Sequence, residues 1–485
     1  MKNRIKQYLL AASMCVGLTA CSDFFEPIPG VQFGLDETFA SKQRTEEYLN
    51  NVYSYVREVT DAIHPNTYGG IFTEASLDGA NRWNKTYAEW TNGSFNSASA
   101  QASEYFSKYY QAIAKASTFI QNVDKCTEAA ASTRGKWKSE ARALRAYYYF
   151  ELLRLYGPIP LIGEDPIPLD ASLEELIKER NSVDECVNFI ATELQSAIDS
   201  GDLLQRAGKA NLGRMDVATC MALKAKLYLY WASPLFNGNT DQASVKNKDG
   251  KQLFPQTEDH SKWTQARDAY ERFMTFATGQ GYKLTEVYTN GKLDPYASCR
   301  AAGEFFTTTW EAVDELIFVK LRDLYDYTYW VCPKFTDFQD TDVTGGGGYY
   351  TTQETVDLFF TKDGLTIEED PGYDKFEGVP GANNFTSGRY YDPNNPSRLY
   401  FDADKSKVLK QWKDREPRFY VNITYSGSIW LNEGKYNEEM RTDFTNGANG
   451  TCGKSKASGD CPDSGYLIRR GAKASNNNGS KHFSP

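Results

Sequence analysis

Apolar residues recur every three or four positions through much of residues 38–278, the spacing that places them on one face of a helix. The two clearest runs are Phe106, Tyr109, Ile113, Ala116, Ile120 and Val123, and Ala141, Leu144, Tyr148, Leu152 and Leu155. Gly157 and Pro158 directly follow the second run and predict its end. These runs predict two consecutive amphipathic helices.

Three more helices are predicted by different signals. Ser182 and Glu185 have the spacing of a capping box, which predicts the start of a helix. Residues 216–231 carry apolar side chains over too wide an arc for a surface helix, so we expect this helix to be buried between neighbours. A fifth helix is predicted over residues 263–277.

The five predicted helices begin near residues 106, 137, 184, 216 and 263, so short and long steps alternate. This alternation favours helices arranged in pairs. Ala146 and Phe150, followed by Pro158, match part of the tetratricopeptide pattern. The sequence therefore predicts a mostly α scaffold of degenerate tetratricopeptide-like helix pairs over residues 38–278; an ordinary helical core is the alternative.

The character of the chain changes over residues 279–485, where helical periodicity fades and turn-forming residues become frequent. Short strands are predicted at residues 316–320, 420–425 and 428–431. Gly345–Gly348 predict a mobile loop, and residues 392–396 a rigid turn. We expect long loops and short strands that cover the scaffold, where binding surfaces are common.

The first twenty residues read as a secretory signal peptide. Lys2, Arg4 and Lys6 precede an uncharged apolar run that is too short to span a membrane. Residues 18–21, Leu-Thr-Ala-Cys, resemble the lipobox of bacterial lipoproteins. The sequence predicts acylation of Cys21 and a lipidated tether over residues 21–37, since several acyl chains give a stable anchor. The alternative is an ordinary signal peptide with an incidental cysteine.

The net charge argues against one class of partner, and the positions of the cysteines indicate which of them are buried. The net charge of −10, without a basic block, argues against nucleic acid as a partner. Cys126, Cys186 and Cys220 lie in apolar helical patterns and are expected to pack as small buried residues. Only Cys452 and Cys461 lie in a loop-like stretch where a disulfide is an open alternative in an exported protein.

The motifs of common enzymes are absent from the sequence. Its three histidines lack the spacing of a zinc-binding helix, and no Gly-x-Ser-x-Gly is present. Residues 340–345 resemble the opening of a calcium loop, but Thr351 stands where a bidentate glutamate is needed, so a structural calcium is left open. We therefore predict no catalytic residue, metal or cofactor, although the 64 Asp and Glu residues leave a carboxylate pair possible.

Two segments combine aromatic rings with polar side chains, the combination that binds sugar rings. The first lies around residues 78–90 and offers Asn81, Arg82, Trp83 and Trp90 as ligand contacts. The second spans residues 323–330 and offers Tyr327 and Trp330. The alternative for both is that the rings pack the loops against the scaffold. Residues 147–150 are assigned to the core instead, because aromatic residues at helical spacing are usually packing residues.

Five stretches in order along the chain resemble the SusD/RagB family of nutrient-binding outer-membrane lipoproteins. They are residues 21–26, 142–161, 222–238, 353–364 and 414–419. The resemblance implies a helical fold with tetratricopeptide-like pairs, displayed on the surface of a Gram-negative bacterium. It also implies a SusC-like TonB-dependent transporter as partner, oligosaccharide as ligand and no catalysis.

The family resemblance leaves several alternatives open. Some family members carry peptides rather than glycans, and a purely structural helical scaffold or a surface hydrolase would belong to other classes of protein. Family members also usually continue into further helices beyond a segment that residues 465–470 resemble. We therefore expect residues 279–485 to be incomplete at their C-terminus, with an uncovered apolar face on the helical scaffold.

Overall fold

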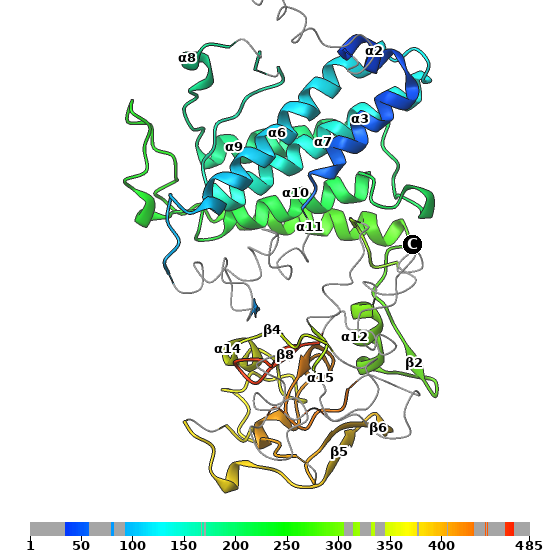
Figure 1. The fold of residues 1–485 in the computed structure, drawn as a ribbon, viewed down its shortest axis with the longest axis vertical. Helices are drawn as coiled ribbons and strands as arrows, with labels where there is room; N and C mark the ends of the chain where they lie inside the picture. Colours follow the sequence, from blue (N-terminus) through cyan, green and yellow to red (C-terminus); the bar gives the residue numbers. More distant parts are fainter. Residues whose placement is uncertain are drawn as a thin grey trace, which may run out of the picture.

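The computed structural model places a helical bundle above a smaller module of short helices and strands (Figure 1). It describes residues 34–57, 79–81, 93–165, 167–168, 171–304, 314–320, 331–334, 345–375, 378–404, 406–430, 442, 444 and 461–469. Within these residues, no helix is both long enough and apolar enough to cross a membrane. The predicted signal peptide, Cys21 and its tether up to residue 33 lie outside them.

All five predicted helices are confirmed. They are α6 (Ala100–Asn122), α7 (Ala131–Tyr156), α9 (Val183–Asp199), α10 (Val217–Ala232) and α11 (Ser261–Gly279). Each of these helices packs against the next along the chain, as expected for helix pairs, and α3 (Lys42–Ser54) packs on α6 and α7 beside the short α2 (Leu35–Ala40). The mostly α fold class is therefore confirmed.

Helix α7 forms the centre of the bundle core. Its residues 143–153 are all buried, including Tyr147–Phe150, so the assignment of this aromatic run to the core is confirmed. Tyr148 packs beside Tyr109 of α6 with ring centroids 6.0 Å apart. The helix ends at Gly157, whose φ of 68° is a conformation that glycine adopts without strain. The predicted stop is thus where the pattern placed it.

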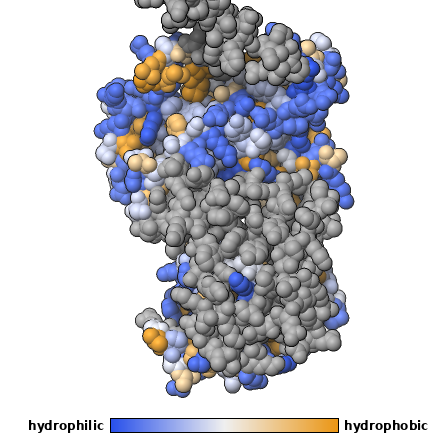
Figure 2. Space-filling view, viewed as in Figure 1, coloured by the Kyte–Doolittle hydropathy of each residue, from blue (hydrophilic) through white to orange (hydrophobic). Residues whose placement is uncertain are grey.

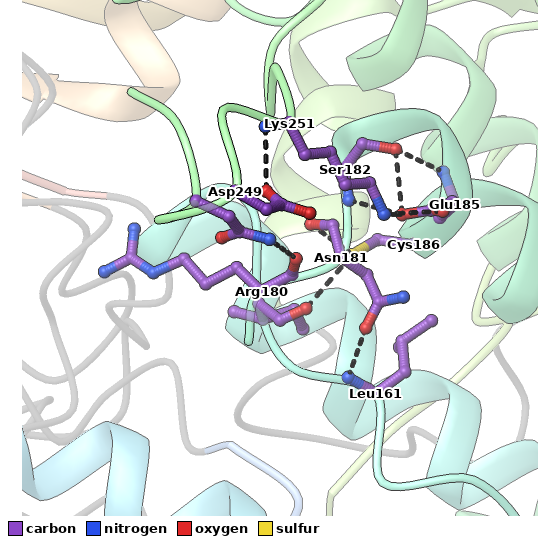
Figure 3. Close-up of polar contacts among 10 residues, drawn as sticks. Leu161, Arg180, Asn181, Ser182, Glu185, Cys186, Asp249 and Lys251 are labelled. Atoms are coloured by element: carbon purple, nitrogen blue, oxygen red, sulfur yellow. Dashed lines mark hydrogen bonds and ion pairs between the residues drawn. The ribbon is translucent and has the colours of Figure 1, made fainter. Parts of the chain in front are cut away.

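The predicted capping box begins α9 (Figure 3). The backbone N–H of Ser182 donates to Glu185 Oε2 at 2.7 Å, and the backbone N–H of Glu185 donates to Ser182 Oγ at 3.3 Å. Lys251 Nζ donates to Glu185 Oε1 at 2.8 Å, and this bond lowers the pKa of the Glu185 carboxyl to about 2. The start of α9 is therefore tied to the turn near residue 251.

Helix α10 is buried only in part. It packs between α9 and α11, and residues 217–220 are buried as expected. Near its C-terminal end, however, the Leu229 side chain is 40% exposed. The wide apolar arc of α10 is therefore wider than the surface that the neighbouring helices cover.

Figure 2 shows a second exposed apolar area at the top left, where the short α8 (Leu173–Leu176) lies with Leu173 and Ile177 exposed.

The smaller module combines short strands with short helices. In the part of the chain that the structure describes, its α-helices are α12 (Pro295–Glu304), α14 (Gln353–Asp357) and α15 (Pro417–Asn422). One hairpin pairs β2 (Tyr288–Thr289) with β3 (Lys292–Leu293), and another pairs β5 (Arg389–Asp392) with β6 (Asn395–Asp402). A four-stranded sheet has the order β1 (Ala80–Asn81), β4 (Tyr349–Tyr350), β8 (Leu467–Ile468) and β7 (Ile423–Thr424). The predicted turn at residues 392–396 connects β5 and β6 and is confirmed.

The strand predictions were less accurate than the helix predictions. Residues 316–320 form no strand, because their contacts are with the helical bundle rather than with another strand. Residues 420–425 are divided between the end of α15 and β7, since Pro417 starts a helix at the preceding turn. Ser428 forms only an isolated bridge with Phe401, and Leu431 lies outside the described residues.

The cysteine predictions are confirmed where the structure describes them. Cys126, Cys186 and Cys220 are buried in apolar surroundings. Cys461 is buried too, but Cys452 lies outside the described residues, so their disulfide remains a prediction. Residues 340–344 of the calcium-like loop are also outside them, and the described residues contain no group of three or more potential metal ligands.

A buried ion cluster ties α12 to the hairpin of β5 and β6. Arg398 of β6 donates to both carboxylate oxygens of Asp294, at 3.0 and 2.9 Å, and also bonds Asp392. Asp294 in turn accepts the backbone N–H of Ala297 at 2.9 Å and so caps α12. Chiefly through the bond from Arg398, the pKa of the Asp294 carboxyl is lowered to about 2.

Asp294 should make the stability of this module dependent on acidity. Its pKa in the unfolded chain is about 3.9, so the lowered value in the folded protein corresponds to about 2 kcal/mol of stability. That contribution is complete above about pH 4 and is lost as the pH falls toward about 2. Urea unfolding of the wild type and Asp294→Asn should therefore differ most near neutral pH and converge in acid. A difference that does not change with pH would contradict this role.

Candidate ligand-binding surface

Most of the predicted ligand contacts lie outside the described residues. This holds for Arg82, Trp83, Trp90, Tyr327 and Trp330, whereas the backbone of Asn81 is described as the last residue of β1. The structure does describe the chain on either side of both aromatic segments. The contacts of these flanking residues indicate how the two segments are related.

The second aromatic segment starts beside the C-terminal end of α3. Lys320 Nζ donates to the carbonyl oxygens of Ser54 at 3.2 Å and Val56 at 2.6 Å. A lysine suits this position because the last carbonyls of a helix carry partial negative charge. Phe318 also packs against Tyr147 of α7 with centroids 6.0 Å apart. The chain therefore enters residues 321–330 next to the place where it leaves α3.

The second segment ends against the run of four glycines. Gly347 N donates to Cys332 O at 3.0 Å, and Gly345 N donates to Pro333 O at 3.1 Å. A Cβ at Gly345 would collide with the carbonyl oxygen of Cys332, and Gly347 has a φ of 56°. Residues 345–348 form no helix or strand, so the predicted loop is confirmed; they are buried, and their mobility remains a prediction. Glycine is needed here because two backbones approach closely.

The glycine run leads into the sheet that also holds Ala80 and Asn81 of the first aromatic segment. Strand β4 pairs antiparallel with β1, with Asn81 opposite Tyr349 and Ala80 opposite Tyr350. Strand β1 lies near the start of the first aromatic segment, residues 78–90, which was predicted to be a loop, and it directly precedes Arg82. Cys332 and Pro333, just after the second aromatic segment, are therefore bonded to the glycines that lead into β4, and β4 pairs with β1 in the first aromatic segment.

A buried ion cluster supports the end of α3. Glu151 of α7 lies 3.2 Å from Arg57 Nε and accepts a bond from Arg154 Nη1 at 2.9 Å. The backbone N–H of Arg57 donates to Tyr147 Oη at 3.4 Å. Burial, with the nearby Glu151 carboxylate, raises the pKa of Tyr109, so this phenol stays neutral. Paired ions and neutral phenols suit a rigid support rather than proton transfer.

Sequence reasoning missed the residues that anchor the two segments. Lys320 was assigned to a strand, and the glycines were assigned to a mobile loop. One signal was available: four consecutive glycines also mark close approach of two backbones. Nothing local identifies Cys332 as their partner, because that contact depends on the tertiary fold.

Comparison with known proteins places the chain in a family. A model described as the SusD family matches residues 315–484, and a model described as starch-binding and associating with the outer membrane matches residues 32–229. The chain belongs to the SusD/RagB family. A curated SusD-like protein from Bacteroides ovatus is 27% identical over 175 residues, a stretch that covers 35% of this chain and only 30% of the relative.

Solved structures share the SusD-like fold. BT4246 superposes with a TM-score of 0.71 at 24% identity, over 90% of this chain and 73% of its own. A SusD-like protein from Bacteroides fragilis has a TM-score of 0.62 at 20% identity, over 90% of this chain and 71% of the fragilis protein. A SusD-like carbohydrate binding protein from the same species reaches 0.57 at 18% identity, covering 89% and 68%. These likenesses establish the fold.

The stretches that resemble the SusD/RagB family carry buried structural residues. Arg145 of α7 is fully buried and donates to Glu193 of α9 through Nε at 2.8 Å and to Ser117 of α6 at 3.1 Å. In the smaller module, Arg415 is buried and donates to the carbonyls of Val356 at 2.7 Å and Phe359 at 2.6 Å. These arginines cross-link segments far apart in the sequence.

Proposed function

We propose that this SusD/RagB protein is a non-catalytic surface lipoprotein that captures oligosaccharides and delivers them to a SusC-like TonB-dependent transporter. The contacts that anchor both aromatic segments carry the proposal. Lys320 bonds the end of α3, Cys332 bonds the glycine run, and β4 pairs with β1. Two loops anchored in this way can present their rings and polar groups to one ligand.

The chemistry of the two segments fits a sugar. Flat rings such as Trp83 and Trp330 stack on the apolar faces of sugars, while Asn81 and Arg82 offer donors and acceptors for hydroxyl groups. One matching family model is described as starch-binding, and one structural neighbour is a SusD-like carbohydrate binding protein; both support the same ligand class.

The proposed location is the outer face of the outer membrane. One matching family model is described as associating with that membrane. Cleavage of the signal peptide over residues 1–20 would leave Cys21 as the lipidated N-terminus, and residues 21–37 would tether the folded body to the lipid. The tether would allow a captured oligosaccharide to be passed to the transporter.

Trp83→Ala should weaken oligosaccharide binding about tenfold or more, because loss of one stacked ring removes at least about 1.4 kcal/mol. Calorimetry with maltohexaose and a panel of other oligosaccharides measures the change. The matched control is Tyr391→Ala on β5, an exposed aromatic residue in a hairpin at the far end of the smaller module from β4 (Figure 1).

Three outcomes would contradict the proposed function. Unchanged affinity of Trp83→Ala, with a native circular dichroism spectrum, would remove this residue from the site. Preferential binding of peptides would favour the peptide-capturing branch of the family. Release of shorter sugars from the panel would show a hydrolase rather than a capture protein.

A further inference from the structure

The smaller module contains a cavity that the proposed surface does not use. Its volume is about 460 Å³, within the range of small-molecule pockets. The cavity lies where α14, the stretch with Lys375, Gly378 and Pro380, residues 409–412 and the turn before β8 meet. None of the predicted ligand contacts lines it. Ser426 and Phe444 complete the lining, so the walls come from segments that are far apart in the sequence.

One wall is a fixed pair of aromatic rings. The indole N–H of Trp412 donates to Tyr466 Oη at 3.0 Å, and that hydroxyl donates to Gln353 Oε1 at 2.7 Å. Both rings are buried and stand edge to face with centroids 5.8 Å apart. Burial raises the pKa of Tyr466 to about 12, so the wall is neutral at physiological pH. It offers apolar surface that keeps its shape.

The rest of the cavity lining includes polar residues, and their formal charges balance. Asp357 at the end of α14 carries a negative charge, and Lys375 carries a positive one. Gln353 Nε2 donates to Asp357 Oδ1 at 2.8 Å, which holds the carboxylate in place, and Lys375 Nζ lies 3.3 Å from Glu368. Gln411 adds a buried amide. The lining suits a neutral ligand that is rich in hydroxyl groups.

Arg415 holds these walls together from behind. It donates to the carbonyls of Val356 and Phe359, at the end of α14, and to Tyr373 Oη at 2.7 Å. Tyr373 Oη in turn donates to the carbonyl of Gln411 at 2.9 Å. Three walls of the cavity are therefore linked through one buried guanidinium. A cavity braced in this way loses little conformational freedom when a ligand enters.

We propose that this cavity is a second binding site, for a neutral saccharide of one or two rings. The apolar face of the sugar would lie against Trp412 and Phe444, and its hydroxyl groups would bond Asp357 and Gln411. An anion would meet the Asp357 carboxylate, and a cation would meet Lys375, so neither is favoured. The site rests on the smaller module alone and does not depend on the aromatic segments of the proposed function.

The test measures binding of glucose, galactose, mannose, maltose and lactose to the full chain by saturation-transfer NMR and calorimetry. At least one of these sugars should bind, and Asp357→Ala should weaken that binding at least tenfold, since bonds to a charged acceptor are strong. The matched control is Glu354→Ala, an exposed carboxylate on the same helix that does not line the cavity. Its affinity should equal that of the wild type.

Three further measurements separate the two sites and guard against misfolding. Lys375→Ala changes an exposed side chain and should also weaken binding while leaving the thermal unfolding curve unchanged. Trp83→Ala should leave binding in the cavity intact even if it abolishes oligosaccharide capture. The charged analogues glucuronate and glucosamine should bind more weakly than glucose. Binding of none of the five sugars, wild-type affinity in Asp357→Ala, or tighter binding of glucuronate would overturn the proposal.

Discussion

Glu193→Ala should destabilise the helical bundle by about 3–5 kcal/mol, because it leaves the charge of Arg145 buried without its partner. Arg145 is fully buried, and both Arg145 and the more exposed Arg142 contact the Glu193 carboxylate. The expected result is a large fall in the midpoint of urea unfolding with little change in its slope. The measurement is equilibrium unfolding followed by far-ultraviolet circular dichroism.

Two further variants show whether the effect arises from the stranded charge. Thr192→Ala changes the exposed neighbour on the same helix and should shift stability by less than about 0.5 kcal/mol. Replacing both partners, as in Arg145→Met with Glu193→Leu, should recover much of the loss, since apolar residues of similar volume often replace a buried ion pair well. A double variant no more stable than Glu193→Ala would contradict this explanation.

Arg415→Ala should destabilise the smaller module by about 3–5 kcal/mol. The change removes the guanidinium bonds to the carbonyls of Val356 and Phe359, of which, among the described residues, only Val356 keeps another donor, the backbone N–H of Phe359 at 3.4 Å. A lost partner of a buried polar group costs about 1–3 kcal/mol. It should also weaken saccharide binding in the cavity, because the end of α14 would no longer be fixed. Near-ultraviolet circular dichroism follows this module through its clustered tyrosines and tryptophans.

The matched control for this prediction lies in the same motif. Arg418 is an exposed arginine whose ion pair is with Glu416, so Arg418→Ala should cost less than about 1 kcal/mol. If Arg415→Ala and Arg418→Ala lower the free energy of unfolding by the same amount, burial of the arginine does not determine the size of the loss. If a folded Arg415→Ala protein still binds saccharide in the cavity with wild-type affinity, Arg415 does not position the cavity walls for binding.

The helices could be predicted because their signals are local. A face of α7 repeats every three to four residues, and Ser182 and Glu185 satisfy each other three positions apart. The burial of Cys126, Cys186 and Cys220 follows from the same periodicity. Some apolar positions of the predicted helices are nevertheless exposed, namely Phe106 on α6, Leu229 on α10 and Trp263 on α11, because exposure depends on how far the neighbouring helices extend.

The strands could not be predicted with similar accuracy. Strands β1, β4, β7 and β8 have two residues each, too few to show alternation, and their partners are far apart in the chain. The local sequence does not predict the contact of Gly345 with Pro333 either, although the close approach of the two backbones explains why glycine is needed there. The cavity wall made by Trp412 and Tyr466 joins residues 54 positions apart.

By itself the amino-acid sequence determined the helical class, the starts of α9, α10 and α11, the end of α7, its buried aromatic run and the family resemblance, because each depends on neighbouring residues or on a short motif. The starts of α6 and α7 lie six residues before the predicted ones. Only the tertiary structure decided which segments meet: Lys320 with the end of α3, the glycines with Cys332, and Arg415 with the walls of the cavity. Such contacts form between segments far apart in the sequence, so the shape of the whole fold selects them.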